Sequence, residues 1–240
     1  METSLYVALA AQRTLQRQLS TVANNIANSN TTGFRAESVN FSSLVVKSDD
    51  ASVHFPSVGR IQPSEQEGSK TQTGNPLDIA VSGKGWLAIS TPGGVAYTRD
   101  GRMNISAFGE LQSLEGNPIL DAGSAPIQID TSSGPIKIQQ DGRIVVNNRV
   151  VGNIGVFEIE TENITGRYSN SSFFSSTAGV PIATGKATSI QQGYLESSNV
   201  NPLKELASLI SITRNFESSS SLLEKADNVI SKSINELSGA

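Results

Sequence analysis

Residues 5–26 read LYVALAAQRTLQRQLSTVANNI, and their spacing decides the fold at this end of the chain. Apolar or small side chains recur in alternating steps of three and four residues, which is typical of a helix whose apolar stripe needs a partner helix. The stripe consists of Leu5, Ala8, Gln12, Leu15, Leu19, Val22 and Ile26. Residues 1–28 contain no Pro or Gly and are rich in good helix formers. We therefore predict one long helix here.

The other end of the chain carries the same pattern over a longer run. Its stripe consists of Leu206, Leu209, Thr213, Phe216, Ser220, Leu223, Asp227, Ile230, Ile234 and Leu237. Asn201 and Pro202 suit a helix start, because Asn caps free backbone N–H groups and Pro at the first helical position loses no hydrogen bond. A helix over residues 203–237 would be roughly 50 Å long, more than a small β-domain can cover. We predict that residues 1–40 and 199–240 together form a discontinuous coiled-coil domain.

Polar residues interrupt both stripes. Gln12 does so in the first, and Thr213, Ser220 and Asp227 do so in the second. They weaken an isolated helix pair and leave room for specific hydrogen bonds between subunits. We therefore predict that the terminal helices are poorly ordered in a dilute monomer and become ordered on assembly.

The segment after the first helix has a different composition. Residues 41–74 include Pro56, Gly59, Pro63 and Gly68 among many Ser, Gln and Thr residues. Such a composition is typical of an extended segment that covers distance without a core of its own. We predict a linker over residues 41–74.

From Leu77 onward the apolar residues alternate with polar ones, beginning with Ile79 and Val81. Short strand-like runs then follow at residues 86–89, 95–98, 103–105, 127–129, 136–138, 144–146, 150–159 and 189–195. Turns rich in Gly, Pro, Asn and Asp separate these runs, and no run has the length or period of a helix. We predict a central, mainly antiparallel all-β domain over residues 75–198, so the fold class is α+β.

Composition excludes several classes of function. The chain has 240 residues, 37% of them hydrophobic, and a net charge of -4, which is ordinary for a protein with a packed core. It has no run rich in Lys or Arg, which argues against a nucleic-acid partner. The absence of cysteine excludes disulfides and thiolate metal sites. We expect no direct membrane insertion and no cleavable signal peptide, because no long apolar segment and no basic N-terminal region precede a cleavage site.

Two features could suggest a bound cofactor or metal, and both are weak. Residues 83–88 read GKGWLA, which matches a dinucleotide-binding loop in its letters, but the residues from Trp86 onward favour a strand instead of the required helix. His54 is the single histidine, and we interpret it as a solvated or interface residue. We predict no cofactor-binding and no metal-binding residue.

Two of five carboxylates could in principle form a catalytic pair of the glycosidase type: Asp78, Asp100, Glu110, Asp121 and Asp141. Most of them stand at turns, where Asp is favoured because it bonds the local backbone. We predict no catalytic residue. A periplasmic carbohydrate-acting enzyme whose helices only dimerise it remains the alternative, as does a binding module of the export-apparatus or chaperone type.

Residues 24–34 read NNIANSNTTGF and resemble the N-terminal signature of the flagellar basal-body rod and hook family. Four further stretches resemble the same family in the same order along the chain: NPLDIAVSGKGW at 75–86, YTRDGR at 97–102, GYLESSNV at 193–200 and RNFE at 214–217. Within the family, residues 4–9 look most similar to proximal rod proteins, with distal rod proteins as the nearest alternative. The resemblance covers nearly the whole chain.

The resemblance implies a structural subunit of the bacterial flagellum, not an enzyme. Such a subunit is exported unfolded by the flagellar type III export apparatus, without signal cleavage. It joins other copies of itself and other rod proteins in a helical tube that crosses the periplasm and transmits torque. The terminal helices would form the inner coiled-coil layer of the tube and the β-domain its outer layer.

The resemblance also implies roles for particular residues. The helix-interface residues would be Leu5, Leu15, Leu19, Val22, Ile26, Leu206, Leu209, Phe216, Leu223, Ile230 and Leu237. The family-motif residues are Asn24, Asn25, Ala27, Asn28, Thr31, Gly33, Phe34 and Asn199. Among these, the three asparagines at the helix end would satisfy polar groups and fix how the chain leaves the helix. Gly33 would turn the chain.

Overall fold

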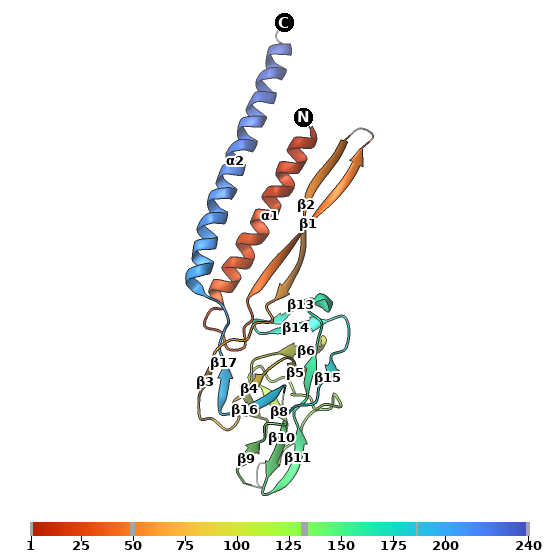
Figure 1. The fold of residues 1–240 in the computed structure, drawn as a ribbon, viewed down its shortest axis with the longest axis vertical. Coiled ribbons are helices and arrows are strands. Elements are labelled where there is room, and N and C mark those ends of the chain that lie inside the picture. The colour runs from red at the N-terminus through yellow and green to blue at the C-terminus, as the bar shows by residue number, and fades with distance from the viewer. Residues whose placement is uncertain (1, 49–50, 131–133, 186, 239–240) are drawn as a thin grey trace. The chain divides into compact units, whose positions relative to one another are not determined.

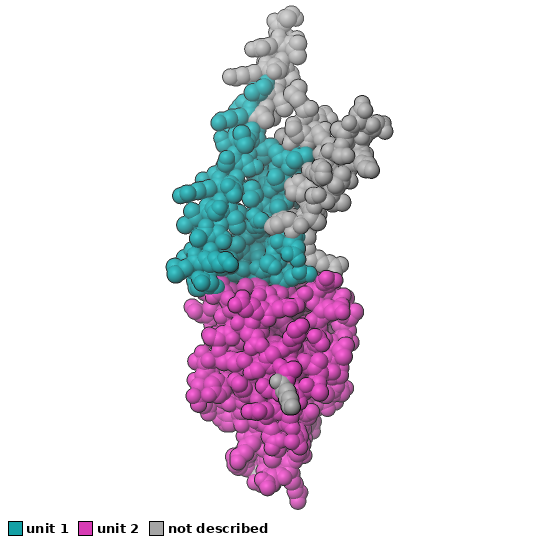
Figure 2. Space-filling view, viewed as in Figure 1, with its two compact units in different colours: residues 1–27, 37–62, 201–240 teal, residues 28–36, 63–200 magenta. Residues whose placement is uncertain are grey.

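The computed structural model describes the chain except residues 1, 49–50, 131–133, 186 and 239–240. Side chains are described outside residues 1–5, 41–61, 131–133, 186, 226–227 and 230–240. The chain divides into two compact units, shown in different colours in Figure 2. Unit 1 contains residues 1–27, 37–62 and 201–240, and unit 2 contains residues 28–36 and 63–200.

Unit 1 is built around the two predicted helices. Helix α1 spans Glu2–Ala27 and helix α2 spans Pro202–Ser238. The two helices lie side by side and run antiparallel (Figure 1). The predicted cap is present, because the Lys204 N–H donates to the Asn201 side-chain oxygen at 3.2 Å. The helical character of both chain ends is therefore confirmed.

The structure differs from the linker predicted over residues 41–74. Strand β1 spans Glu37–Ser48 and strand β2 spans Ala51–Pro63, and the two form a two-stranded sheet. The Asn40 side-chain amide donates to the Gln62 side-chain oxygen at 2.7 Å at the open end of this hairpin. Valine and aromatic residues recur in both strands and favour extended, paired backbone, and this preference outweighs the scattered Pro and Gly.

Unit 2 contains the remaining strands, and every strand pairing described within it is antiparallel. The largest sheet has six strands in the order β13-β14-β6-β5-β12-β15, and a three-stranded sheet has the order β11-β10-β9. Three two-stranded sheets complete the unit: β16-β4, β17-β3 and β7-β8. This arrangement confirms a mainly antiparallel β region between the terminal helices (Figure 1).

The strands of unit 2 have the following bounds: β3 Lys70–Gln72, β4 Ile79–Ser82, β5 Trp86–Thr91, β6 Gly94–Thr98, β7 Met103–Ile105, β8 Leu111–Ser113, β9 Ile136–Ile138, β10 Arg143–Val146, β11 Arg149–Asn153, β12 Val156–Glu158, β13 Ile164–Ser169, β14 Ser172–Ser175, β15 Val180–Pro181, β16 Ser189–Gln192 and β17 Tyr194–Glu196. A short 3-10 helix, η2, spans Thr161–Asn163. Trp86 opens strand β5 after a turn in which Gly83 and Gly85 both have positive φ. Residues 83–85 thus join β4 to β5, and a strand begins at Trp86, as predicted, although β4 pairs with β16 and not with β5.

The core of unit 2 consists of two apolar clusters. The larger one is aliphatic and includes Ile79, Leu87, Leu111, Ile119, Ile144 and Ile190, each at most 1% exposed. The smaller one is aromatic, and in it Trp86 meets Phe173 edge to face with ring centres 5.6 Å apart. Each fully buried side chain of this size stabilises the unit by about 1.5–3 kcal/mol.

Candidate functional site

The predicted helix-interface residues are only partly buried in the described helices. Leu15, Leu19, Val22 and Ile26 of α1 and Leu209, Phe216 and Leu223 of α2 all have intermediate exposure. Leu206 is 44% exposed. The side chains of Leu5, Ile230 and Leu237 lie outside the described residues. The described stripe residues of the paired helices therefore keep part of their apolar surface in contact with solvent.

The buried side chains of α1 are polar. Thr14, Thr21 and Asn25 are at most 9% exposed. The Thr14 hydroxyl donates to the Ala10 carbonyl at 2.9 Å, and the Thr21 hydroxyl donates to the Arg17 carbonyl at 3.1 Å. Small side chains that satisfy their own hydroxyls let a neighbouring backbone approach closely, so this helix face suits tight packing.

The polar interruptions of the two stripes contact each other. The Gln12 side-chain amide donates to the Ser220 hydroxyl at 3.1 Å, which links α1 to α2 within one chain. The Thr213 hydroxyl donates to the Leu209 carbonyl of its own helix at 2.8 Å. The side chain of Asp227 lies outside the described residues. At least one interruption thus fixes the pairing of the two helices of a single subunit.

The asparagines at the end of α1 hold the start of strand β1. Asn25 is 2% exposed; its side-chain oxygen accepts from the Glu37 N–H at 2.8 Å, and its amide donates to the Glu37 carbonyl at 3.0 Å. The Asn24 amide donates to the Glu37 carboxylate at 3.1 Å. Asn25 therefore imitates a strand partner for Glu37, as expected of a residue that fixes how the chain leaves the helix.

The next motif residues turn the chain inside unit 2. The Thr31 hydroxyl donates to the Asn28 side-chain oxygen at 3.1 Å. Gly33 has φ +68°, the left-handed conformation predicted for it. A Cβ at this position would lie 2.3 Å from the Asp100 backbone nitrogen, so only glycine fits. Phe34 then enters the interior with no exposed surface.

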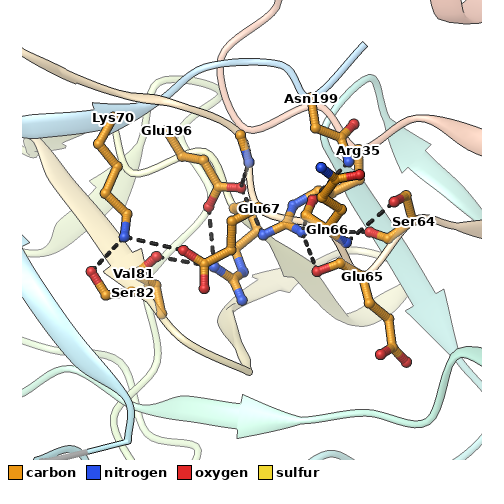
Figure 3. A network of polar contacts seen from close by, with 12 residues as sticks. Arg35, Ser64, Glu65, Gln66, Glu67, Lys70, Val81, Ser82, Glu196 and Asn199 are labelled. Carbon is orange, nitrogen blue, oxygen red and sulfur yellow. Dashed lines mark hydrogen bonds and ion pairs between the residues drawn. The ribbon is translucent and has the colours of Figure 1, made fainter. Parts of the chain in front are cut away.

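A charged cluster follows this turn. Glu196, at the end of β17, is fully buried, and its two carboxylate oxygens lie 2.7 Å from Arg35 and 3.0 Å from Arg99. Both arginine side chains are at most 3% exposed. The Gly68 N–H adds a fourth group, donating to the carboxylate at 3.1 Å. We call Arg35, Arg99, Glu196 and Asn199 the exit network. Figure 3 labels three of them, Arg35, Glu196 and Asn199.

The exit network collects the segments at which the chain enters and leaves unit 2. The Arg35 guanidinium donates to three consecutive backbone carbonyls, at Ser64, Glu65 and Gln66. The Asn199 side chain accepts from the Ala36 N–H and donates to the Gln66 carbonyl, each at 2.7 Å. Residues 35–36, 64–66 and 196–199 are thereby tied together, and the divisions between the units fall close to each of them in the sequence.

The electrostatics of the exit network are unbalanced. Burial lowers the pKa of Arg35 and of Arg99, and the Glu196 carboxylate opposes this effect at both. Two buried guanidinium groups share the one carboxylate, and each also lies within 6 Å of the Trp86 ring centre, at 5.8 and 5.5 Å. Arginine stays protonated in proteins, so the carboxylate and the ring offset its charge.

A second ion pair lies beside the network. The Lys70 ammonium is 3.1 Å from the Glu67 carboxylate, which also accepts from the Gly83 N–H at 2.7 Å. Burial would raise the pKa of Glu67, but these hydrogen bonds and the nearby charges of Lys70 and Arg99 outweigh it and lower the pKa. Glu67 is therefore ionised over the whole neutral range.

The carboxylates weighed for catalysis serve local turns. Asp78 accepts from Thr73 and Asn75, and Asp121 accepts from the backbone N–H groups of its own turn. Asp100 pairs with Arg102 and Asp141 with Arg143. Glu110 accepts from the Gln112 side chain. Among the described residues, no three His, Cys, Asp or Glu side chains gather as a metal site would require.

Sequence reasoning did not identify Arg35, Arg99 or Glu196 as important residues. Arg99 and Glu196 lie within stretches that resemble the family. Of the four exit-network residues, however, only Asn199 is among the family-motif residues predicted from the sequence. A charged residue between apolar strand residues is normally placed on the exposed face, so the sequence carries no sign of this burial. His54 lies in β2, and its side chain is outside the described residues.

Three protein-family models match successive parts of the chain. A model described as flagella basal body rod protein matches residues 5–35. A model of the D1 domain of flagellar hook protein FlgE/F/G matches residues 80–146. The model of the flagellar basal body rod FlgEFG protein C-terminal region matches residues 191–237. The exit network draws its residues from both terminal matches and from the central one.

Curated relatives are similar over almost their full length. Flagellar basal-body rod protein FlgF of Mesorhizobium japonicum is 44% identical over 225 residues, covering 94% of this chain and 93% of the relative. FlgF of Rhizobium meliloti is 40% identical over 240 residues, covering 100% of both chains. Flagellar basal-body rod protein FlgG of Bacillus subtilis is less similar, at 27% identity over 258 residues, 97% of this chain and 98% of the relative.

Proposed function

The chain belongs to the flagellar basal-body rod protein family, and we propose that it builds the rod by packing its terminal helices against those of neighbouring subunits. It is a structural subunit of the flagellar rod, not an enzyme, in line with the families and relatives that it matches. The enzyme and chaperone alternatives find no support among them.

The observation that carries this proposal is the incomplete burial of the helix pair. Leu19 and Phe216 keep intermediate exposure, and Leu206 is 44% exposed. Leu203 and Ile210, three residues before Leu206 and four residues after it, lie on the same face of α2 and are 80% and 55% exposed. An apolar face that is this exposed needs more partners than one antiparallel neighbour supplies. Further copies of this chain and other rod proteins are those partners, arranged as a coiled coil.

The remaining parts of the proposal concern how the subunit reaches its place. The subunit is exported unfolded by the flagellar type III export apparatus, without a cleavable signal, and then folds as it joins the rod in the periplasm. The described helices contain no stretch long and apolar enough to cross a bilayer. Once assembled, the subunit passes torque along the tube.

Single substitutions at the helix stripes test the proposal. A strain lacking the gene should arrest flagellar assembly at the rod, and Leu19→Asp or Phe216→Asp should reproduce that arrest while the amount of exported protein stays normal. A buried charge in a helix interface costs several kcal/mol, so the effect should be severe. The matched controls Gln16→Asp and Ser221→Asp place the same charge on exposed positions of α1 and α2 and should leave motility intact. Full motility of both stripe variants would refute the proposed packing.

A further inference from the structure

The three-stranded sheet β11-β10-β9 has an outer face with an apolar centre and a basic rim. Val145 lies directly opposite Lys137 on β9 and Val150 on β11, so the three side chains share one face. Val150 is 57% exposed and Lys137 is exposed. Arg143, two residues before Val145, lies on the same face, is 52% exposed and forms an ion pair with Asp141. The opposite face buries Ile138 and Ile144 in the aliphatic core.

One of the two edge strands of this sheet, β11, is shaped against pairing with another strand. The register of β10 on β11 shifts between Ile144 and Val145, which leaves Val151 as an extra, bulged residue that is 38% exposed. Bulged edge strands resist the addition of a further strand. Asn147 and Asn148 close the hairpin with positive φ at both positions, which makes a tight turn. The face is therefore held in place and presents side chains, not free backbone, to a partner.

A complementary surface exists elsewhere on unit 2. Glu158 of β12 lies directly opposite Val180 of the edge strand β15, so these two side chains share a face. Val180 is 65% exposed, and Glu158, Glu160 and Glu162 are all exposed. The Glu160 carboxylate accepts from the Asn163 amide at 3.0 Å. Like the outer face of β11-β10-β9, this surface has an exposed valine with charged side chains beside it. Its charges are negative, whereas Lys137 on the other surface is positive.

We propose that the outer face of β11-β10-β9 in one copy of this chain packs on the Glu158 and Val180 surface of the next copy, with Val150 against Val180 and Lys137 beside Glu158. An interface between two unlike surfaces repeats from one copy to the next, as a ring or a helical tube requires, whereas two identical surfaces would stop at a dimer. The strands β11 and β15 lie at separate places on unit 2 (Figure 1). The inference rests on the proposed function and adds a second contact, made by unit 2.

Crosslinking tests this contact directly, because the chain contains no cysteine. Val150→Cys and Val180→Cys are placed on separate copies, the two copies are expressed together, and isolated basal bodies are treated with a short bis-maleimide. We expect a covalent dimer whose linked peptides join residues 150 and 180. In the matched control, Val95→Cys replaces Val180→Cys, and no dimer is expected although Val95 is 39% exposed.

Two results would overturn the inference. One is the absence of the 150–180 link in normally assembled rods, provided that both cysteines react once the rods are dissociated. The other is a link from residue 150 to a different rod protein. Basal bodies that lack the chain would contradict the proposed function instead. Charge reversal gives a second readout: Lys137→Glu and Glu158→Lys should each reduce the fraction of motile cells, and the double variant should restore it. Equal motility of all three variants would also overturn the inference.

Discussion

The two units of this chain bury their apolar residues to very different extents. In unit 2, Leu111 and Ile144 have no exposed surface, whereas in unit 1 the corresponding apolar residues of α1, Leu15 and Leu19, keep intermediate exposure. Unit 2 closes its core within one chain, whereas the described helix residues of unit 1 keep part of their apolar surface exposed. On the proposed function, unit 2 gains its stability by folding and unit 1 by assembly.

The largest effect should come from removing the carboxylate of the exit network. Glu196→Gln leaves Arg35 and Arg99 buried without a counter charge, which we expect to destabilise unit 2 by about 3–5 kcal/mol in urea unfolding. The control Asp141→Asn removes an exposed ion pair with Arg143 and should cost about 1 kcal/mol or less. Equal costs for the two variants would show that the buried network does not hold unit 2 together.

Truncating a leucine in each unit tests the comparison itself. Leu111→Ala should destabilise the isolated chain by about 2–5 kcal/mol, because it opens a cavity in a closed core. Leu206→Ala should leave the isolated chain within about 0.5 kcal/mol of the parent, because that side chain is 44% exposed. Although Leu206→Ala should hardly change the stability of the isolated chain, it should impair rod assembly and yield fewer complete basal bodies. A large loss of unfolding free energy in the isolated Leu206→Ala variant would mean that Leu206 already belongs to a closed core in the monomer.

A smaller effect is expected at the end of α1. Asn25→Ala removes the two hydrogen bonds that Asn25 makes to the backbone of Glu37, at a cost of about 1–3 kcal/mol that should be confined to unit 1. Amide exchange at Glu37 should accelerate while exchange in β5 stays unchanged. Asn30→Ala, at an exposed position nearby, serves as the control. Faster exchange throughout unit 2 would mean that the two units are not independent.

The smallest effect concerns pH. The folded chain holds the pKa of Glu67 below its ordinary value, so the ionised carboxylate stabilises unit 2 above about pH 4.3. That contribution is lost as the pH falls through the lowered pKa. Unfolding curves of the parent and of Glu67→Gln should therefore differ at neutral pH and converge in acid. A constant difference between them across the pH range would contradict this role.

Periodicity predicted the helices and most strands of this chain. The stripes of α1 and α2 repeat over many turns, and the alternation at Ile79 and Val81 is equally plain. The hairpin of β1 and β2 was missed because its prolines and glycines suggested a linker. In a two-stranded sheet, however, Pro and Gly at positions that need no ladder hydrogen bond destabilise the strands little. Residues 127–129 were predicted as a strand, but Gln128 makes an isolated bridge with Glu110, and buried side chains rather than a ladder account for the apolar spacing.

The sites were less predictable than the elements. Asn25 and Gly33 could be selected because each has a local role, a cap and a left-handed turn, that residue type alone implies. Arg35, Arg99 and Glu196 could not, because their pairing joins positions up to 161 residues apart, as the separation of Arg35 from Glu196 shows. Local sequence rules place such charges at the surface. Only the folded chain brings them together.

The central claim is that the terminal helices complete their core on assembly while unit 2 is complete beforehand. Hydrogen exchange of the dilute monomer and of isolated rods, followed peptide by peptide, tests it most directly. The account predicts fast exchange in α1 and α2 of the monomer, strong protection of both helices in rods, and equal protection of β5 and β6 in both samples. Helices as protected in the monomer as in the rod would contradict it.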